Sequence, residues 1–195
     1  MQGLFNRAVQ CFLRDTYGHG LWLAVARRAG VGPEGFEAML TYDNAVTEAV
    51  LTAAVAELAR PRETVLEDLG TYLVSHPNVE GLRRLLRFGG AGFVEFLHSL
   101  EDLPDRTHLA LPDLDMPGLD LEDQGNSRFR LSCRGVIPGV GYVAVGLLRA
   151  MADDYGALVL LEHDGEADGA EVILIELLDG AYAAGRRFDL AVRAH

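Results

Sequence analysis

The periodicity of the apolar residues changes once along the chain, and this change constrains the fold more than any other feature. Up to about residue 103, apolar side chains recur every three or four residues, as on one face of a helix. Beyond that point, prolines, aspartates and glycines shorten every segment, and alternating patterns typical of strands appear. We therefore predict an α+β fold, in which an N-terminal multi-helix lobe packs on a C-terminal antiparallel sheet with one or two helices.

Six helices are predicted in the first part, separated by helix-breaking residues. Gly30 and the pair Gly89-Gly90 interrupt the pattern, because glycine is unfavourable inside a helix and common just after one. Asp43 or Asn44 can cap the third helix, and Pro61 suits the first turn of the fourth. The predicted helices cover residues 2–17, 21–29, 44–59, 61–75, 78–88 and 92–103.

The second part combines strands with one more helix. We predict a strand over 129–133, a helix over 140–154, and strands over 157–162 and 170–177, which the turn-forming residues 164–169 join into an antiparallel hairpin. A chain of 195 residues is too short for two separate cores. We expect one domain over 1–195, with a helical lobe at 1–103, an α/β lobe at 104–177 and a short strand or tail at 178–195.

Composition restricts the class of protein. The hydrophobic share of 49% and charged share of 24% are those of a soluble globular protein. The net charge of −12 repels phosphate backbones, so nucleic acid is not an expected partner. No apolar run is long enough to span a membrane, and Cys11 and Cys133 are expected to be reduced thiols. We therefore expect a cytoplasmic protein.

Motifs of enzymatic chemistry are missing from the sequence. It contains no nucleophile elbow, phosphate-binding loop, dinucleotide fingerprint or zinc-protease motif. The Gly139-Val140-Gly141 segment precedes a helix and could contact an anion, but because the rest of a dinucleotide fingerprint is missing, it is interpreted as a tight entry to that helix. The pair Asp153-Asp154 and the arginine cluster of the fifth helix (Arg83, Arg84 and Arg87) are interpreted as solvated surface groups. We do not expect an enzyme.

Several short motifs occur together and in a defined order. They are MQGLFNRA at the start, DTYG from Asp15, LTYD from Leu40, LGTY from Leu69 and FVEFLHSL from Phe93. In this order and near this spacing, they resemble the haem-nitric-oxide/oxygen-binding (H-NOX) domains and the haem-binding region of soluble guanylate cyclase. The resemblance covers about residues 1–177 and implies a haem-based sensor domain of the predicted α+β fold.

The resemblance places proline where the family keeps its iron-binding histidine. The ungapped correspondence leads from Phe96 through Leu103 to Pro104, and Pro112 and Pro117 fall where the family has prolines that touch the porphyrin. Proline has no side-chain donor, so the family's iron–imidazole bond cannot form at this position.

A replacement ligand would have to come from another histidine. His108 is the candidate because it lies one helical turn beyond Pro104 if a helix begins there; the alternative is a surface histidine. His76, His163 and His195 are expected in loops or at the terminus.

The family's propionate-binding motif Y-x-S-x-R corresponds to Arg130-Leu-Ser132-Cys-Arg134, in which the tyrosine is replaced by arginine. The resemblance thus implies that Arg130, Ser132 and Arg134 hold haem propionates, and that Phe5 and Pro117 contact the ring. The alternative remains open that Arg130, Ser132 and Arg134, which share one face of the predicted strand, are solvated or form salt bridges.

Two functions are consistent with the sequence. The first is a sensor that binds haem b, another tetrapyrrole or a different hydrophobic ligand, and passes its signal to a histidine kinase or a cyclic-di-nucleotide enzyme, as the resemblance implies. The second is a haem-free interaction module with a closed pocket.

Overall fold

The computed structural model describes residues 3–110, 116–135 and 137–186. The first part is helical, as predicted, and the start of α3 is capped by Asp43, which accepts a hydrogen bond from the Ala45 N–H at 2.9 Å. The helices are α1 (Gly3–Tyr17), α2 (His19–Ala29), α3 (Asn44–Leu58), α4 (Arg62–Ser75), the 3₁₀ helix η1 (Pro77–Val79), α5 (Glu80–Arg87), α6 (Phe93–His98), α7 (Leu103–Ala110) and α8 (Val140–Tyr155).

Four strands form one antiparallel sheet with the order β1-β2-β4-β3. They are β1 (Gly118–Gly125), β2 (Arg128–Arg134), β3 (Leu158–Ala167) and β4 (Ala170–Asp179). Both hairpins turn on two residues with positive φ, Asn126-Ser127 and Asp168-Gly169, which matches the twist of paired strands. The predicted hairpin of β3 and β4 is confirmed.

The segment between residues 104 and 127 is more regular than predicted. The sixth predicted helix ends at His98, and a separate helix, α7, begins at Leu103 and includes Pro104 in its first turn, where proline is tolerated. Strand β1 was missed, because five of its eight residues are glycine, aspartate or glutamate, which strands disfavour. The strand forms because its backbone pairs with that of β2. Of its residues, only Leu119 and Leu121 pack on the core.

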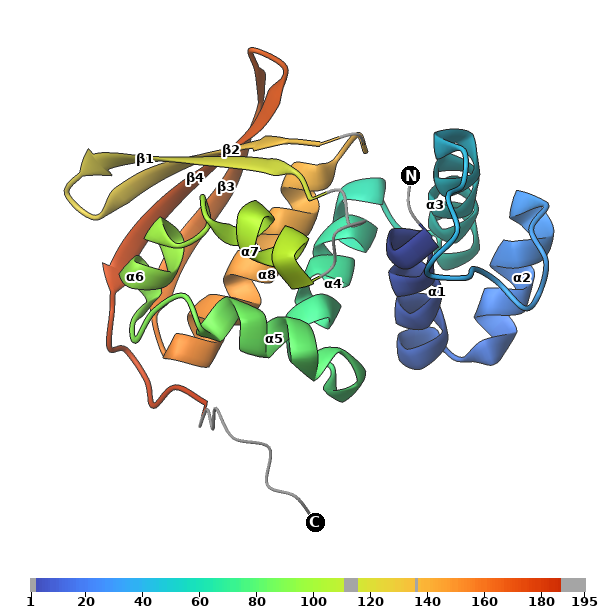
Figure 1. The fold of residues 1–195 in the computed structure, drawn as a ribbon, viewed down its shortest axis with the longest axis horizontal. Coiled ribbons are helices and arrows are strands. Elements are labelled where there is room, and N and C mark those ends of the chain that lie inside the picture. Colours follow the sequence, from blue (N-terminus) through green and yellow to red (C-terminus); the bar gives the residue numbers. More distant parts are fainter. Residues whose placement is uncertain (1–2, 111–115, 136, 187–195) are drawn as a thin grey trace.

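The elements are arranged as two packed groups that meet at α4. Figure 1 shows α5 to α8 on one side of the sheet, whereas α1, α2 and α3 lie together at the other end of the molecule. One buried cluster includes Trp22 and Leu69, and the other includes Val74, Phe96 and Ile173. The boundary between the two buried clusters therefore runs through α4.

The chain after β4 packs against the end of α8. The Ala183 N–H donates to the Gly156 carbonyl at 3.0 Å, and the Arg186 N–H donates to the Asp154 carbonyl at 2.9 Å. A Cβ atom at Gly156 would lie in the carbonyl of Ala183, so only glycine permits this approach. Residues 180–186 thus pack against the end of α8. No helix among the described residues has the length and apolar character needed to cross a membrane.

Candidate functional site

The segment that the resemblance assigned to the family's ligand helix runs from α6 into α7. Leu103 is 2% exposed and belongs to the core beneath the sheet, while Pro104 is half-buried. The side chain of His108 lies outside the described residues, but its position is within α7. Because α7 is one helix, positions 104 and 108 lie on the same face, separated by one turn of about 6 Å.

The three residues of the propionate motif share one face of β2, as predicted, and this face points away from the helices. Phe129, Leu131 and Cys133, which alternate with them, are buried under α6 and α8. The cross-strand neighbours of Arg130 are Glu122 on β1 and Leu174 on β4.

The other residues that the resemblance implied lie elsewhere. Phe5 is half-buried against the N-terminal core, and Pro117 precedes β1. The structure therefore does not gather Phe5 and the residues of the propionate motif around one buried cavity. Pro112 lies outside the described residues.

Helices α4 and α8 join the two groups through direct backbone contact. A Cβ atom at Gly146 would lie 1.9 Å from the Glu67 carbonyl oxygen, and one at Gly70 would lie 2.0 Å from that of Val143. The Thr71 hydroxyl donates to the Gly146 carbonyl at 3.3 Å. Two glycines thus let the helices touch where the groups meet.

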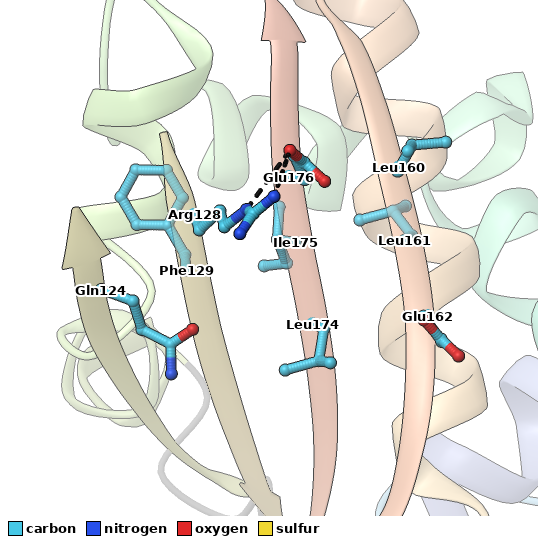
Figure 2. A pocket seen from close by; sticks show the side chains of 9 residues that line it. All are labelled: Gln124, Arg128, Phe129, Leu160, Leu161, Glu162, Leu174, Ile175 and Glu176. Atoms are coloured by element: carbon cyan, nitrogen blue, oxygen red, sulfur yellow. Dashed lines mark hydrogen bonds and ion pairs between the residues drawn. The ribbon is translucent and has the colours of Figure 1, made fainter. Parts of the chain in front are cut away.

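Two hollows stand out among the described residues, and both lie away from this junction. One, of about 530 Å³, is formed on the sheet near Leu160, Leu174 and Glu176 (Figure 2). The other, of about 180 Å³, lies beside the start of α8, near Ile137 and Glu171. Neither is lined by residues of α1, α4, α6 or α7.

A carboxylate from β4 satisfies the start of α8. Glu171 accepts hydrogen bonds from the Gly139 N–H at 2.6 Å and the Gly141 N–H at 3.0 Å, where the helix dipole favours negative charge. The Glu171 carboxylate also lies 2.9 Å from Nε2 of His163, whose ring stacks on Tyr142 at 4.0 Å between centroids. His163 is therefore a structural residue of β3 and not the expected loop residue. The tight helix entry inferred for 139–141 is confirmed.

Sequence reasoning also missed a buried ion-pair cluster. The side chain of Asp154 is fully buried, and Arg83 binds it through Nη2 at 2.7 Å and Nε at 3.0 Å. Arg87 approaches the same carboxylate at 3.6 Å and stacks on the Tyr155 ring at 3.9 Å. The interpretation of these groups as solvated was wrong for Arg83, Arg87 and Asp154, because the fold brings α5 across the end of α8.

A second polar cluster ties α1 to α4 and η1. The Tyr72 hydroxyl and the Asn78 amide both donate to Asp15 at 2.8 Å. Burial alone would raise the pKa of the Asp15 carboxyl, but the hydrogen bonds from Asn78, Tyr72 and Arg14 outweigh it and hold the pKa below its ordinary value of 3.8. This carboxylate is therefore ionised and structural at neutral pH.

The described residues offer no preformed metal site. No group of three or more histidine, cysteine, aspartate or glutamate side chains among them could hold a metal ion. Burial raises the pKa of the Cys133 thiol to about 12, so this free cysteine is a neutral core residue.

The architecture is that of H-NOX domains. An H-NOX protein from S. oneidensis superposes with a TM-score of 0.77 at 15% identity, covering 92% of this chain and 97% of that one. A T. tengcongensis H-NOX superposes with a TM-score of 0.76 at 15% identity over 92% and 99% of the two chains. At this identity the likeness shows the fold.

The sequence supports the same assignment. The family described as haem-NO-binding matches residues 2–163, and the chain belongs to this family. Soluble guanylate cyclase gcy-31 of Caenorhabditis elegans is 21% identical over 84% of this chain, and soluble guanylate cyclase 89Da of Drosophila melanogaster is 19% identical over 92%. The chain spans about a quarter of the length of these relatives, at 24% and 28%.

The fit of a family-type haem to these residues is poor. The resemblance assigns the ligand position to Pro104, which offers no iron donor, and the residues that it assigns to the propionates lie on the face of β2 that points away from the core. The residues present therefore do not fit a haem held by the family's iron–imidazole bond.

Proposed function

We propose that this chain is a signalling domain that has lost the family's haem ligation and acts through contact with a partner protein. The observation that carries the proposal is Pro104, which the resemblance assigns to the ligand position and which lies in the first turn of a helix whose first residue, Leu103, is part of the core. A domain without an internal ligand can still transmit a signal if its surface differs between two conformations.

We further propose that the partner is a histidine kinase or a cyclic-di-nucleotide enzyme, and that the domain itself catalyses no reaction. The family membership supports a sensory context. The cytoplasm is the proposed location, because such partners expose their regulated domains there.

A second candidate function, atypical haem binding through His108, is favoured by one observation. Helix α7 includes both position 104 and position 108, so His108 lies one turn beyond the family's ligand position. In that case Arg130, Ser132 and Arg134 would act near the propionates only if β2 or the haem were placed differently from the arrangement seen here.

Haem titration of the purified chain, followed by absorption spectroscopy, tests the proposal. We expect no sharp Soret band and no saturation, because Pro104, at the position that the resemblance assigns to the axial ligand, supplies no iron donor. A sharp band that disappears in His108→Ala would overturn the proposal and identify the axial ligand. His98→Ala, which removes an exposed histidine of α6, is the matched control.

The propionate motif is tested in the same titration. If haem binds and Arg134→Ala weakens the band, the motif holds propionates in spite of its outward direction. If no haem binds, Arg134→Ala changes nothing in the spectrum, as the proposal expects.

A further inference from the structure

The connection between α2 and α3, residues 30–43, is anchored to the helices by side-chain hydrogen bonds. Trp22 of α2 donates from its indole Nε1 to the Pro33 carbonyl at 2.8 Å. Gln10 of α1 donates from its amide to the Glu34 carbonyl at 3.1 Å. These contacts come from two different helices, so they fix the path of the connection between them.

Phe36 holds the middle of the connection in the N-terminal core. Its side chain is 4% exposed and contacts the rings of Trp22 and Tyr42, the second at 5.0 Å between centroids. The Phe36 N–H donates to Gln10 Oε1 at 3.0 Å, and the Glu37 N–H donates to the Tyr42 hydroxyl at 3.0 Å. The connection is therefore packed on both sides of Phe36.

The tip of this connection, Met39 and Leu40, is apolar and exposed. Met39 is 86% exposed and Leu40 is 50% exposed. The Leu40 carbonyl accepts a hydrogen bond from the Gly3 N–H at 2.7 Å, and the Leu40 N–H donates to the Glu37 carbonyl at 3.2 Å. The tip thus projects from a fixed backbone beside the start of α1, at the end of the molecule away from the sheet (Figure 1).

The charges that flank the tip in the sequence are all negative. Residues 29–59 contain no lysine, arginine or histidine, and five acidic residues. These are Glu34, Glu37, Asp43, Glu48 and Glu57. The last two form ion pairs with Arg62 and Arg28. The three nearest to the tip form no ion pair with another described residue, and they outweigh the single guanidinium that the first two turns of α1 add, that of Arg7.

We propose that the tip docks onto a basic amphipathic helix of a partner protein, an inference that rests on the proposed function of signalling through protein contact. The apolar face of a helix leaves holes between its side chains that accept an exposed methionine and leucine. Its lysines and arginines then lie opposite the three carboxylates. Methionine suits such a contact because its unbranched side chain adapts to the partner.

The fixed backbone favours side-chain docking over strand addition. The N–H and C=O groups of Leu40 and the N–H of Glu37 already form hydrogen bonds within the chain, so they are not available to a partner strand. A connection that is already ordered also avoids the entropy cost of ordering on binding. An apolar pair of residues in this setting is suited to act as the centre of a small interface.

The sign of the charge argues against two other occupants. A second copy of this chain has a net charge of −12 and is repelled. An anionic membrane surface repels the same three carboxylates. A basic helix is the occupant that both the apolar tip and its acidic surroundings attract.

Binding of a model helix to the whole chain tests the proposal. The probe is a fluorescein-labelled peptide of about 18 leucine and lysine residues, with the leucines on one helical face. The reference peptide has the same composition in an order that gives no apolar face. Fluorescence anisotropy should show that the amphipathic peptide binds at least about tenfold more tightly, because the reference peptide is held by charge alone.

A change at the tip tests where the peptide binds. Met39→Ser should weaken the amphipathic peptide roughly tenfold, since it removes the side chain that becomes buried on binding. Phe88→Ser, which changes a side chain that is 71% exposed at the end of α5, is the matched control and should leave the affinity unchanged. Fluorescence of Trp22, which is bonded to Pro33, checks that the connection is intact in each variant.

The acidic side chains are tested by a paired substitution. Glu34→Gln with Glu37→Gln should weaken binding at low salt and reduce its dependence on salt, because two of the charges that face the peptide are gone. Asp164→Asn with Glu166→Gln makes the same change of charge on the exposed residues of β3 and should have a much smaller effect. Equal losses from the two pairs would mean that the peptide responds only to the charge of the whole chain, which overturns the proposal.

Three further results would overturn it. They are equal binding of the two peptides, an unchanged affinity of Met39→Ser, and an equal loss in Phe88→Ser. Cosedimentation with phosphatidylcholine vesicles tests a lipid surface, and we expect none of the chain to sediment. Vesicle binding that Met39→Ser abolishes would assign the tip to a membrane instead.

The outcome is separable from that of the proposed function. If the peptide fails to bind at the tip, this docking surface is wrong, while the haem titration still decides whether the domain has lost haem ligation. If a sharp Soret band appears, the proposed function falls whatever the peptide does.

Discussion

Asp154 shows how much one buried residue can depend on distant partners. Its carboxylate is fully buried, and the two guanidinium groups that neutralise it come from α5, 71 residues away in sequence for Arg83. The Arg186 side chain, from the segment after β4, lies 3.9 Å from the same carboxylate. A single residue therefore connects α5, α8 and the C-terminal segment.

We expect Asp154→Asn to lower the free energy of unfolding by about 3 kcal/mol, because it removes the charge that Asp154 supplies to two mostly buried guanidinium groups. Urea denaturation measures the loss. Asp153→Asn changes the same residue type at the exposed neighbouring position and should have an effect of at most about 0.5 kcal/mol. Equal effects of the two changes would show that the buried cluster contributes nothing specific.

At the scale of elements, the contact between α4 and α8 determines how the two packed groups fit together. Gly146 and Gly70 each face a backbone carbonyl of the other helix at a distance that no side chain permits. The start of α8 is fixed independently by Glu171 from β4, so the helix is held at one end by the sheet and along its length by α4.

Gly146→Ala should therefore destabilise the protein by about 1–3 kcal/mol or more, although alanine favours a helix, because the methyl group forces α4 and α8 apart. Chemical denaturation gives the value. The control is Gly81→Ala in α5, where the new methyl group meets no atom within 4 Å and should stabilise by about 0.5–1 kcal/mol. A stabilising Gly146→Ala would mean that the helices are not in contact.

At the scale of the whole molecule, two buried clusters share the helix α4. The first contains Trp22, the single tryptophan, which is fully buried and donates to the Pro33 carbonyl at 2.8 Å. The second lies under the sheet and includes Ile173 on β4. Because α4 contributes to both, we propose that residues 1–195 unfold as one domain.

A single cooperative transition is the expected outcome, with the same midpoint in Trp22 fluorescence and in far-ultraviolet circular dichroism. Asp154→Asn, which acts in the second cluster, should shift both signals equally, even though Trp22 lies in the first. If the fluorescence midpoint stays unchanged while the dichroism midpoint falls, the two groups are separate folding units.

The sequence alone determined the local structure and the family. Apolar spacing and breakers at Gly30 and Pro61 predicted the helices, because helical periodicity involves only neighbours within a few residues. The turn-forming residues 164–169 predicted the hairpin for the same reason, and the structure places its turn at Asp168-Gly169. Strand β1 was not predicted, because its composition is unfavourable for a strand. It forms because its pairing with β2 outweighs that composition, and this pairing is not visible in the local sequence.

Only the tertiary structure decided which polar groups meet and which face each motif presents. Spacing put Arg130, Ser132 and Arg134 on one side of a strand, but the packing of α6 and α8 turned that side outward. Likewise, Asp154 and Glu171 gained their partners when distant segments came together. Such contacts depend on how whole elements cross, a property that no short stretch of residues contains.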